Sequence, residues 1–405
     1  MKLSRRNFLW MSGLSMTPLV KRPSGRQKDA SPGFKQRIKS SSFDGWVEID
    51  FDSLAWNLKK IQERVKVPIM AVIKANAYGH GQLEVARFLE SRGIDSLMVG
   101  KLQEALFLRE SGMTCPILNF GPFGAQETEL IIRNNISQSV FTSSVGGLNS
   151  AALQLDQKAQ VHIHVDTGMG RAGLPYYRAL PFLEHVSKLK GIEIAGISTT
   201  LTEDFEFDRE QLKRFLSLIQ EATQQGLWLG RKHAASSSAL LTCPSAFLDL
   251  VRPGITLYGY YPSDETQAED ALNLRPVLRL KSRVYEVKTL RSGDSVSYHK
   301  AYTAKKTEKM ALVPIGYSDG YPDQAIEKAS VLIRGRRYSL IGTITANHME
   351  VLLGHQTAVR AGDEVVLIGR QGQESITAVE LARWAGTSVY KILIGLNPLL
   401  PKKCI

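Results

Sequence analysis

A lysine at the end of a buried strand is the residue in this sequence best placed to do chemistry. The apolar run Val67–Ile73 predicts a buried strand, and Lys74 follows it directly. A buried ammonium is costly, so such a lysine needs an anionic partner or a lowered pKa. A neutral amine in that place is a nucleophile toward aldehydes. The sequence therefore indicates an imine-forming lysine, and a strand-end lysine that reaches solvent is the alternative.

Three further segments place polar side chains directly after apolar runs. Arg171 follows a glycine-rich turn and offers a fork of donors suited to an oxygen anion. Ser236–Ser238 follow another run and can donate hydrogen bonds to a phosphate, although a plain helix cap is the commoner role. Arg252 ends a third run, before Pro253 and Gly254. From these residues alone, a surface arginine after a glycine turn is an equally good interpretation of Arg171.

The eight residues from Lys74 to Gly81, Lys-Ala-Asn-Ala-Tyr-Gly-His-Gly, closely resemble the pyridoxal phosphate (PLP) motif of the alanine racemase family. The segments around Arg171, Arg252 and Tyr298 resemble the same family, and the resemblance covers about residues 45–400. It implies a homodimer with shared active sites that interconverts the L and D forms of an amino acid, alanine above all.

The resemblance also implies how the cofactor is bound. Lys74 would hold PLP covalently, and Arg171 would bond its phenolic oxygen and orient the substrate carboxylate. Arg252, supported by His233, would bond the pyridine nitrogen and keep it unprotonated, which disfavours transamination and decarboxylation. The remaining cofactor-binding residues implied by the family are Tyr78, Ser237, Gly254 and Ile255.

Catalysis in this family uses two bases on opposite faces of the substrate. The resemblance gives these roles to Lys74 and to Tyr298, which would reach into the barrel of a partner copy. A phenol is a poor base at neutral pH unless cations stabilise the phenolate, and a lone strand tyrosine is usually a packing residue. The substrate would contact Arg171, Tyr317 and the backbone of Ala346.

Several positions depart from the family pattern. Thr200, Ala346 and Pro398 are smaller than the histidine, methionine and tyrosine usual there, and His164 replaces a lysine. A larger pocket discriminates less against larger side chains, at roughly 1–3 kcal/mol per methylene. The alternative function is therefore a broad-specificity racemase that accepts serine or larger amino acids.

Other classes of protein are weighed against the racemase. A decarboxylase of the same fold would carry a carboxylate at the position of Arg252. A non-catalytic PLP-binding protein would lack the second domain and Tyr298. The net charge of +12 could suggest nucleic-acid binding, but no platform of interleaved aromatic and basic residues is evident. The three cysteines are widely separated and predict no metal site.

The elements that position these residues alternate regularly. Eight apolar strands separated by helical stretches predict a (β/α)8 TIM barrel in an α/β fold, and the last of these strands is expected at Val251–Tyr258. On that fold, catalytic residues lie at the carboxyl ends of the strands. From about Leu274, short strands punctuated by glycines predict a mainly β domain, interrupted by one helix at Thr377–Ala385. The expected domains are thus 43–273 and 274–405.

Residues 1–42 are expected to be a signal peptide and linker. Residues 1–41 hold ten Lys or Arg and one Asp, so this segment accounts for +9 of the net charge of +12. Arg5 and Arg6 precede a short uncharged run, as in a twin-arginine export signal. That run is too short for a comfortable membrane span. The sequence predicts a periplasmic protein without a stable span once the signal is removed, or a cytoplasmic one if the signal does not function.

Overall fold

The computed structural model describes residues 43–268 and 272–405. The expected signal peptide and linker, residues 1–42, lie outside the described residues. None of the helices in this described part combines the length and apolar character that a membrane crossing needs.

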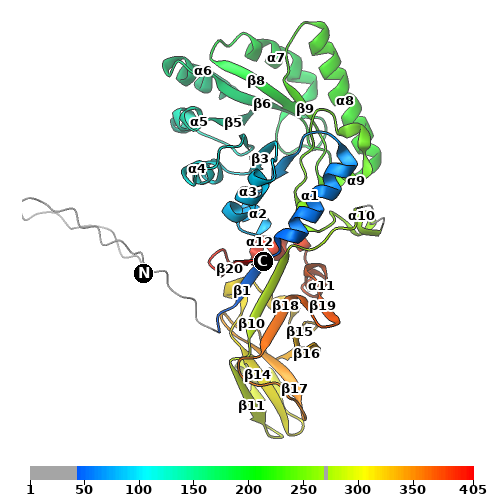
Figure 1. Cartoon of the computed structure of the whole chain (residues 1–405). Helices are drawn as coiled ribbons and strands as arrows, with labels where there is room; N and C mark the ends of the chain where they lie inside the picture. Colours follow the sequence, from blue (N-terminus) through cyan, green and yellow to red (C-terminus); the bar gives the residue numbers. More distant parts are fainter. Residues whose placement is uncertain (1–42, 269–271) are drawn as a thin grey trace, which may run out of the picture. The chain divides into compact units, whose positions relative to one another are not determined.

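A parallel sheet forms the first half of the described chain, drawn from blue to green in Figure 1. Its strands follow one another in chain order, each beside the next, which is the arrangement expected for a barrel of βα units. The strands, in spatial order, are β2 (Met70–Val72), β3 (Ser96–Val99), β4 (Ile117–Asn119), β5 (Ile136–Val140), β6 (Ala159–Asp166), β8 (Ile192–Ser198) and β9 (Arg231–His233), and β7 (Leu174–Pro175) pairs with β6.

Residues 251–253 close this sheet into a barrel. Val251 forms a parallel bridge with Ile69, just before β2. On the other side, the Arg252 N–H donates to the Ala235 carbonyl, just after β9, at 2.8 Å. The predicted TIM barrel is confirmed, with an eighth position that is bridged rather than built as a regular strand.

The expected strand at Val251–Tyr258 is wrong beyond its first residues. Pro253 has no N–H to donate to a ladder, so a regular strand cannot continue through it. The chain turns instead into a 3-10 helix, η4 (Ile255–Tyr258), which ends at Gly259 with φ +88°. The turn carries the backbone of Gly254 and Ile255 across the carboxyl end of the barrel, where ligands bind on this fold.

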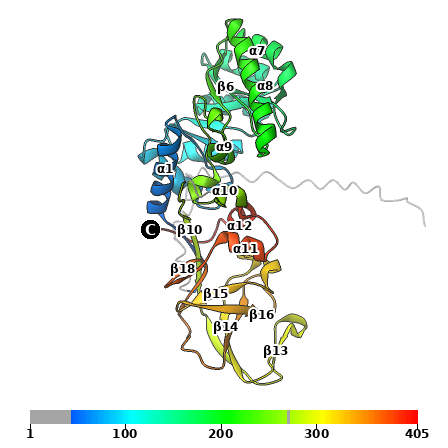
Figure 2. The same cartoon turned by 90° about the vertical axis from the view of Figure 1, so that its right-hand side faces the viewer.

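Helices connect the parallel strands and cover their outer face (Figures 1 and 2). The α-helices of this half are α1 (Phe51–Val65), α2 (Lys74–Tyr78), α3 (Gln82–Ser91), α4 (Leu102–Glu110), α5 (Thr128–Arg133), α6 (Val145–Gln154), α7 (Ala179–Ser187), α8 (Phe205–Gln224), α9 (Ser237–Thr242) and α10 (Asp264–Ala268). Short 3-10 helices are η1 (Ala125–Glu127), η2 (Tyr176–Arg178) and η3 (Pro244–Ala246).

A mostly antiparallel sheet forms the second half, and in Figure 1 most of its strands are yellow to orange, with β1 in blue and β20 in red. Its strands are β11 (Glu286–Leu290), β14 (Glu308–Val313), β17 (Met349–Gly354), β16 (Arg336–Ile341), β15 (Ser330–Ile333), β18 (Glu364–Gln371), β10 (Leu278–Arg283), β1 (Trp46–Ile49) and β20 (Lys402–Cys404), with β19 (Glu374–Ile376) paired to β18. Two more, β12 (Ser295–Val296) and β13 (Tyr302–Thr303), form a separate ribbon. The expectation of a mainly β second domain is confirmed.

The remaining elements of this half are short helices: η5 (Tyr298–Lys300), η6 (Tyr317–Asp319), η7 (Asp323–Ala325), α11 (Ala378–Trp384) and α12 (Val389–Gly395). The helix expected near 377–385 corresponds to α11, whereas α12 was not expected. Strand β1 lies within the expected first domain, 43–273, but it belongs to the second sheet. It pairs antiparallel with β10 and parallel with β20, so the second sheet takes a strand from each end of the described chain.

One buried side chain on α1 connects this helix to the chain that follows the barrel. Asn57 is fully buried, and its amide donates to the carbonyls of Leu257 at 3.0 Å and Arg275 at 2.7 Å. Its side-chain oxygen accepts from the Arg275 N–H at 2.8 Å. The sequence shows Asn57 only as one polar position on an amphipathic helix, so its role depends on tertiary contacts.

Replacing Asn57 with Ala is therefore expected to destabilise the protein by about 2–4 kcal/mol, because buried backbone groups lose their partners. Urea unfolding followed by circular dichroism measures this change. Asn134→Ala is the matched control, since its amide bonds a nearby helix carbonyl in an exposed setting, and it is expected to change stability by less than about 0.5 kcal/mol. Equal effects of the two substitutions would contradict the prediction.

Candidate active site

Lys74 follows β2 and begins a backbone turn with left-handed conformations. The next four residues all have left-handed conformations: Ala75 (φ +53°), Asn76 (φ +56°), Ala77 (φ +52°) and Tyr78 (φ +52°). Each costs roughly 1–2 kcal/mol for a residue with a Cβ, and such strain concentrates at functional sites. The small residues at 75 and 77 limit the steric conflict. The spacing of small residues in the sequence gave no hint of this handedness.

Glu104, in the first turn of α4, holds this turn in place. Its carboxylate accepts from the N–H of Ala75 at 2.6 Å and from the N–H of Gly100 at 2.9 Å. These bonds connect the turn after β2 to the end of β3. Sequence reasoning did not single out Glu104, although an acidic residue three positions into a helix is a recognisable capping signal.

The electrostatic surroundings of Lys74 lower the pKa of its amine. Burial lowers the pKa of Lys74, the nearby Arg171 guanidinium lowers it further, and Glu104 partly opposes the shift. A lysine with a lowered pKa is a better nucleophile and a better proton acceptor near neutral pH. The position therefore has the electrostatics that an imine-forming lysine needs.

Lys74 opens into a cavity of about 830 Å³. Most of the residues singled out from the sequence line it: Lys74, Tyr78, Arg171, Thr200, Ser237, Arg252, Gly254 and Ile255. They come from the ends of β2, β6, β8 and β9 and from the chain around residue 251, so the barrel brings together side chains that are far apart in the sequence.

Arg252 is a buried cation held by uncharged acceptors. It is 5% exposed, and its guanidinium donates to His233 Nδ1 at 2.6 Å and to the carbonyls of Thr199 at 2.7 Å and Ala234 at 3.0 Å. Burial lowers the pKa of Arg252 to about 10, so the group stays charged at neutral pH. A charged group in this position favours an anionic ligand.

Ser237, Gly254 and Tyr78 form a compact polar corner of the cavity. Ser237 Oγ accepts from the Gly254 N–H at 2.9 Å. A Cβ at Gly254 would lie 2.6 Å from the Tyr78 hydroxyl, so only glycine lets these groups approach this closely. The corner offers hydroxyl and backbone donors of the kind that bind phosphate.

Helix α12 adds two residues that sequence reasoning missed. Tyr390 and Ile394 line the cavity, and the centroid of the Tyr390 ring lies 6.1 Å from the centroid of the Tyr78 ring. Pro398 and Ala346, weighed with Thr200 as smaller groups around one pocket, do not line this cavity, whereas Thr200 does. The signal for α12 was weak because it is only seven residues long.

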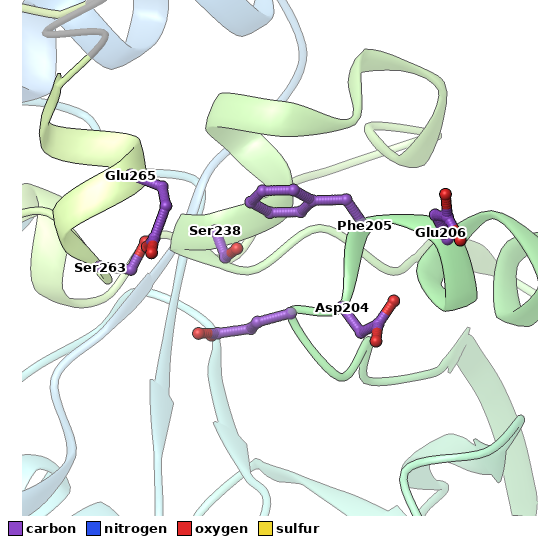
Figure 3. A pocket seen from close by; sticks show the side chains of 7 residues that line it. Asp204, Phe205, Glu206, Ser238, Ser263 and Glu265 are labelled. Carbon is purple, nitrogen blue, oxygen red and sulfur yellow. The ribbon is translucent and has the colours of Figure 1, made fainter.

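A second cavity of about 550 Å³ adjoins the first and shares Glu203 with it. Figure 3 shows Glu265 and Ser263 lining one side and Asp204 and Glu206 the other. Its lining holds four carboxylates and no basic residue. The cation-rich cavity at Lys74 therefore borders an acidic one.

Tyr298, Tyr317 and Ala346 lie outside the Lys74 cavity in the described chain. Tyr298 is 71% exposed on η5, next to Ser297 (φ +67°) and His299 (φ +57°). Tyr317 is 55% exposed on η6, and its N–H donates to the Thr345 carbonyl at 3.0 Å, which places it beside Ala346. A single copy of the chain thus provides the lysine but not the tyrosine.

Fold and geometry together define a class of protein. A nucleophilic lysine at a barrel strand end, a buried arginine and a phosphate-type corner belong to barrel enzymes that bind a phosphorylated aldehyde cofactor.

Comparisons with known proteins identify the family. Residues 49–262 match the model "Alanine racemase, N-terminal domain", and residues 277–404 match "Alanine racemase, C-terminal domain". The alanine racemase of Carboxydothermus hydrogenoformans is 36% identical over 363 residues, covering 88% of this chain and 98% of the relative. That of Symbiobacterium thermophilum is 38% identical over 363 residues, covering 88% and 96%. The solved alanine racemase of Clostridium difficile has a TM-score of 0.85 at 33% identity, covering 89% and 96%. The chain belongs to the alanine racemase family.

Enzymes of this family depend on PLP, and the residues of the cavity fit that group. PLP carries an aldehyde, a phosphate and a ring nitrogen. Lys74 supplies an amine with a lowered pKa, and Ser237 and the Gly254 N–H supply donors. Arg252 supplies a charged donor that is not neutralised by a carboxylate among its hydrogen-bond partners.

Buried histidines near the site make stability depend on pH. Burial lowers the pKa of His80 and His162 to about 4 and that of His164 to about 3, from an ordinary value of 6.5. Between these values the unfolded chain binds protons that the folded chain does not. We therefore expect the free energy of unfolding to be highest above about pH 6.5 and to decrease steadily as the pH drops toward 4.

The His80→Gln variant isolates the contribution of one group. Between about pH 6 and pH 4.5, the slope of unfolding free energy against pH should be smaller than in the wild type by up to about 1.4 kcal/mol per pH unit, the value for one proton. Urea unfolding at a series of pH values measures the slope. The same slope in both proteins would show that His80 is protonated in the folded state.

Proposed function

We propose that the chain is a PLP-dependent racemase that interconverts L- and D-alanine, with Lys74 and Tyr298 as its two proton-transfer groups. The observation that carries the proposal is the position of Lys74, whose pKa is lowered, in a cavity that also holds Arg252 and the Ser237 corner. The curated relatives, which are alanine racemases, support alanine as the substrate. A range that includes serine or larger amino acids is not favoured by these relatives.

The cavity residues suggest a division of roles. Lys74 would hold the cofactor through its aldehyde carbon, and Tyr78, Ser237, Gly254 and Ile255 would surround its phosphate. Arg252 would donate to the ring nitrogen, which stays unprotonated because arginine remains charged. Arg171, whose guanidinium lies close enough to lower the pKa of Lys74, would bind the carboxylate of the amino acid.

Racemisation follows from proton transfer on two faces. When bound, PLP withdraws electrons from the α-carbon of the amino acid and makes its proton acidic. Lys74 Nζ, once the substrate amine has displaced it from the cofactor, would accept that proton from one face, and the Tyr298 hydroxyl of a second copy would return a proton to the other face. The roles exchange in the reverse direction, so inversion requires neither group to cross the substrate.

A homodimer with shared active sites is part of this proposal. Tyr298 is displayed on an exposed, left-handed turn of the second domain and does not reach the cavity of its own chain. A second copy is the partner that supplies a tyrosine for each lysine. The solvent-facing position of Tyr298 in one copy supports a role at an interface.

Mixing two inactive variants tests lysine, tyrosine and dimer together. Lys74→Ala and Tyr298→Phe should each lower alanine racemisation on the order of 10²-fold or more. Co-refolded or co-expressed mixtures should regain roughly a quarter of wild-type activity, because half of the dimers are mixed and each has one site with both wild-type groups. Chiral chromatography of alanine measures the rate.

The far-UV circular dichroism and melting temperature of each variant serve as the folding control. Persistence of wild-type activity in folded Lys74→Ala would contradict the proposed chemistry. Absence of recovery in mixtures that contain folded mixed dimers would contradict the shared site, while the role of Lys74 would stand on its own variant.

We also propose that the enzyme is exported to the periplasm. The support is the sequence pattern of Arg5 and Arg6 before a short uncharged run, in a segment outside the described residues. A pathway that carries folded proteins suits an enzyme loaded with its cofactor before export.

Export depends on the paired arginines if the signal is of this type. The full-length protein should place racemase activity in the periplasmic fraction of a host with a twin-arginine pathway. The double substitution Arg5→Lys and Arg6→Lys should leave the activity in the cytoplasmic fraction, with the total amount unchanged. Equal export of both forms would contradict the proposal.

A further inference from the structure

A line of three buried polar groups runs through the barrel interior from Arg252. The Arg252 guanidinium donates to His233 Nδ1 at 2.6 Å, and His233 Nε2 lies 2.9 Å from His162 Nδ1. Their exposures are 5% for Arg252, 0% for His233 and 6% for His162. Water therefore has little access to these contacts, and each group depends on its neighbour.

The chemistry of the first group determines the protonation of the other two. A guanidinium has no acceptor, so His233 Nδ1 must accept the bond from Arg252. A neutral imidazole then carries its proton on Nε2, and His162 Nδ1 must accept it. Burial lowers the pKa of both histidines, and the nearby Arg252 charge lowers it further, which keeps both rings neutral. Arg252 thus fixes which nitrogen of His233 carries the proton, and His162 accepts the hydrogen bond from that N–H.

A glycine on the neighbouring strand leaves space for the His162 ring. Gly196 lies on β8 beside His162 of β6, and a Cβ at Gly196 would lie 2.5 Å from His162 Nδ1. The β6–β8 register is also irregular between Val161 and His162. This contact is independent of the hydrogen bonds, and it involves the same nitrogen that accepts from His233.

Beyond His162 the line ends in a small polar cavity at the opposite end of the barrel from Lys74. It measures about 160 Å³, and Asp95, Ser137, Gln160 and Arg231 are among the residues that line it with His162. Strands β3 and β4 begin at this end, whereas the Lys74 cavity lies where the strands finish.

We propose that His162 is a positioning residue for Arg252, which it controls by holding His233 as a hydrogen-bond acceptor. Within the described residues, Arg252 donates to one side chain, His233, and to the carbonyls of Thr199 and Ala234. Loss of the acceptor at residue 162 leaves the His233 Nε2–H without a partner and frees the ring to turn away from the guanidinium. The proposal rests on the cofactor-binding role of Arg252 for its effect on rate, but not for its effect on the His233 ring.

Two substitutions of His162 separate hydrogen bonding from packing. The Oδ1 atom of His162→Asn can replace Nδ1 as an acceptor, whereas His162→Leu has no acceptor. In the holoenzyme, we expect His162→Leu to lower kcat/KM for alanine on the order of tenfold, the cost of an unsatisfied buried donor. His162→Asn should retain most of the wild-type value. Gly196→Ala, which pushes on the His162 ring, should lower kcat/KM in the same direction.

Nitrogen-15 NMR of histidine-labelled protein provides a readout that does not depend on activity. In the wild type and in His162→Asn, His233 should give the signal of a ring protonated on Nε2. In His162→Leu, the Nε2 and Nε2–H signals of His233 should shift, because that N–H loses its hydrogen-bond acceptor. Assignment comes from comparison with His233→Gln.

Ser137→Ala is the matched control, because it removes a hydroxyl from the same small cavity without touching the line to Arg252. It should leave kcat/KM and the His233 signal unchanged. Equal losses in His162→Leu and His162→Asn, an unchanged His233 signal in folded His162→Leu, or an equal loss in Ser137→Ala would each overturn the proposal. If wild-type protein did not racemise alanine, the proposed function would fail, and the NMR comparison would still decide the role of His162.

Discussion

The buried charge of Arg252 is the constraint on which the rest of the site depends. A guanidinium that is 5% exposed and bonded only to His233 and two carbonyls carries a positive charge that the protein does not neutralise through those bonds. An unpaired buried charge is costly, and the cost falls when an anionic ligand enters. The pKa of Lys74 is lowered by burial first and then by a different cation, the Arg171 guanidinium. Ligand affinity and lysine reactivity therefore depend on two different arginines that line one cavity.

The backbone around Lys74 shows how the fold offsets local strain. Four consecutive left-handed residues would be unfavourable in an isolated peptide. The Glu104 carboxylate bonds the Ala75 N–H, and Asn76 accepts from the Gln82 N–H at 3.0 Å, so the turn is fixed from both sides. A lysine on such a turn has a defined direction into the cavity. The strained turn that displays Tyr298 presents a similar case in the second domain, where the tyrosine faces outward.

Much of the barrel could be predicted because its strands are apolar runs at regular spacing. The prediction failed where a single residue overrode the pattern, as when Pro253 ended the eighth strand and η4 replaced its second half. It also failed where pairing joins distant segments. The position of β1 in the sequence predicts a strand of the first domain, yet β1 pairs with β10 and β20 in the second sheet. Short helix α12 was missed because seven residues give little periodicity, although it brings Tyr390 to the cavity.

The sequence by itself determined the types of chemical group available and their order, because a lysine after an apolar run and arginines after glycine-rich turns are local features. The family motifs added which of them act together. Only the tertiary structure decided the handedness of the turn at Lys74, the partners of Arg252 and the exposure of Tyr298. These properties depend on atoms contributed by strands far apart in the chain, such as His233, Thr199 and Ala234 around one guanidinium, and no local pattern encodes those distances.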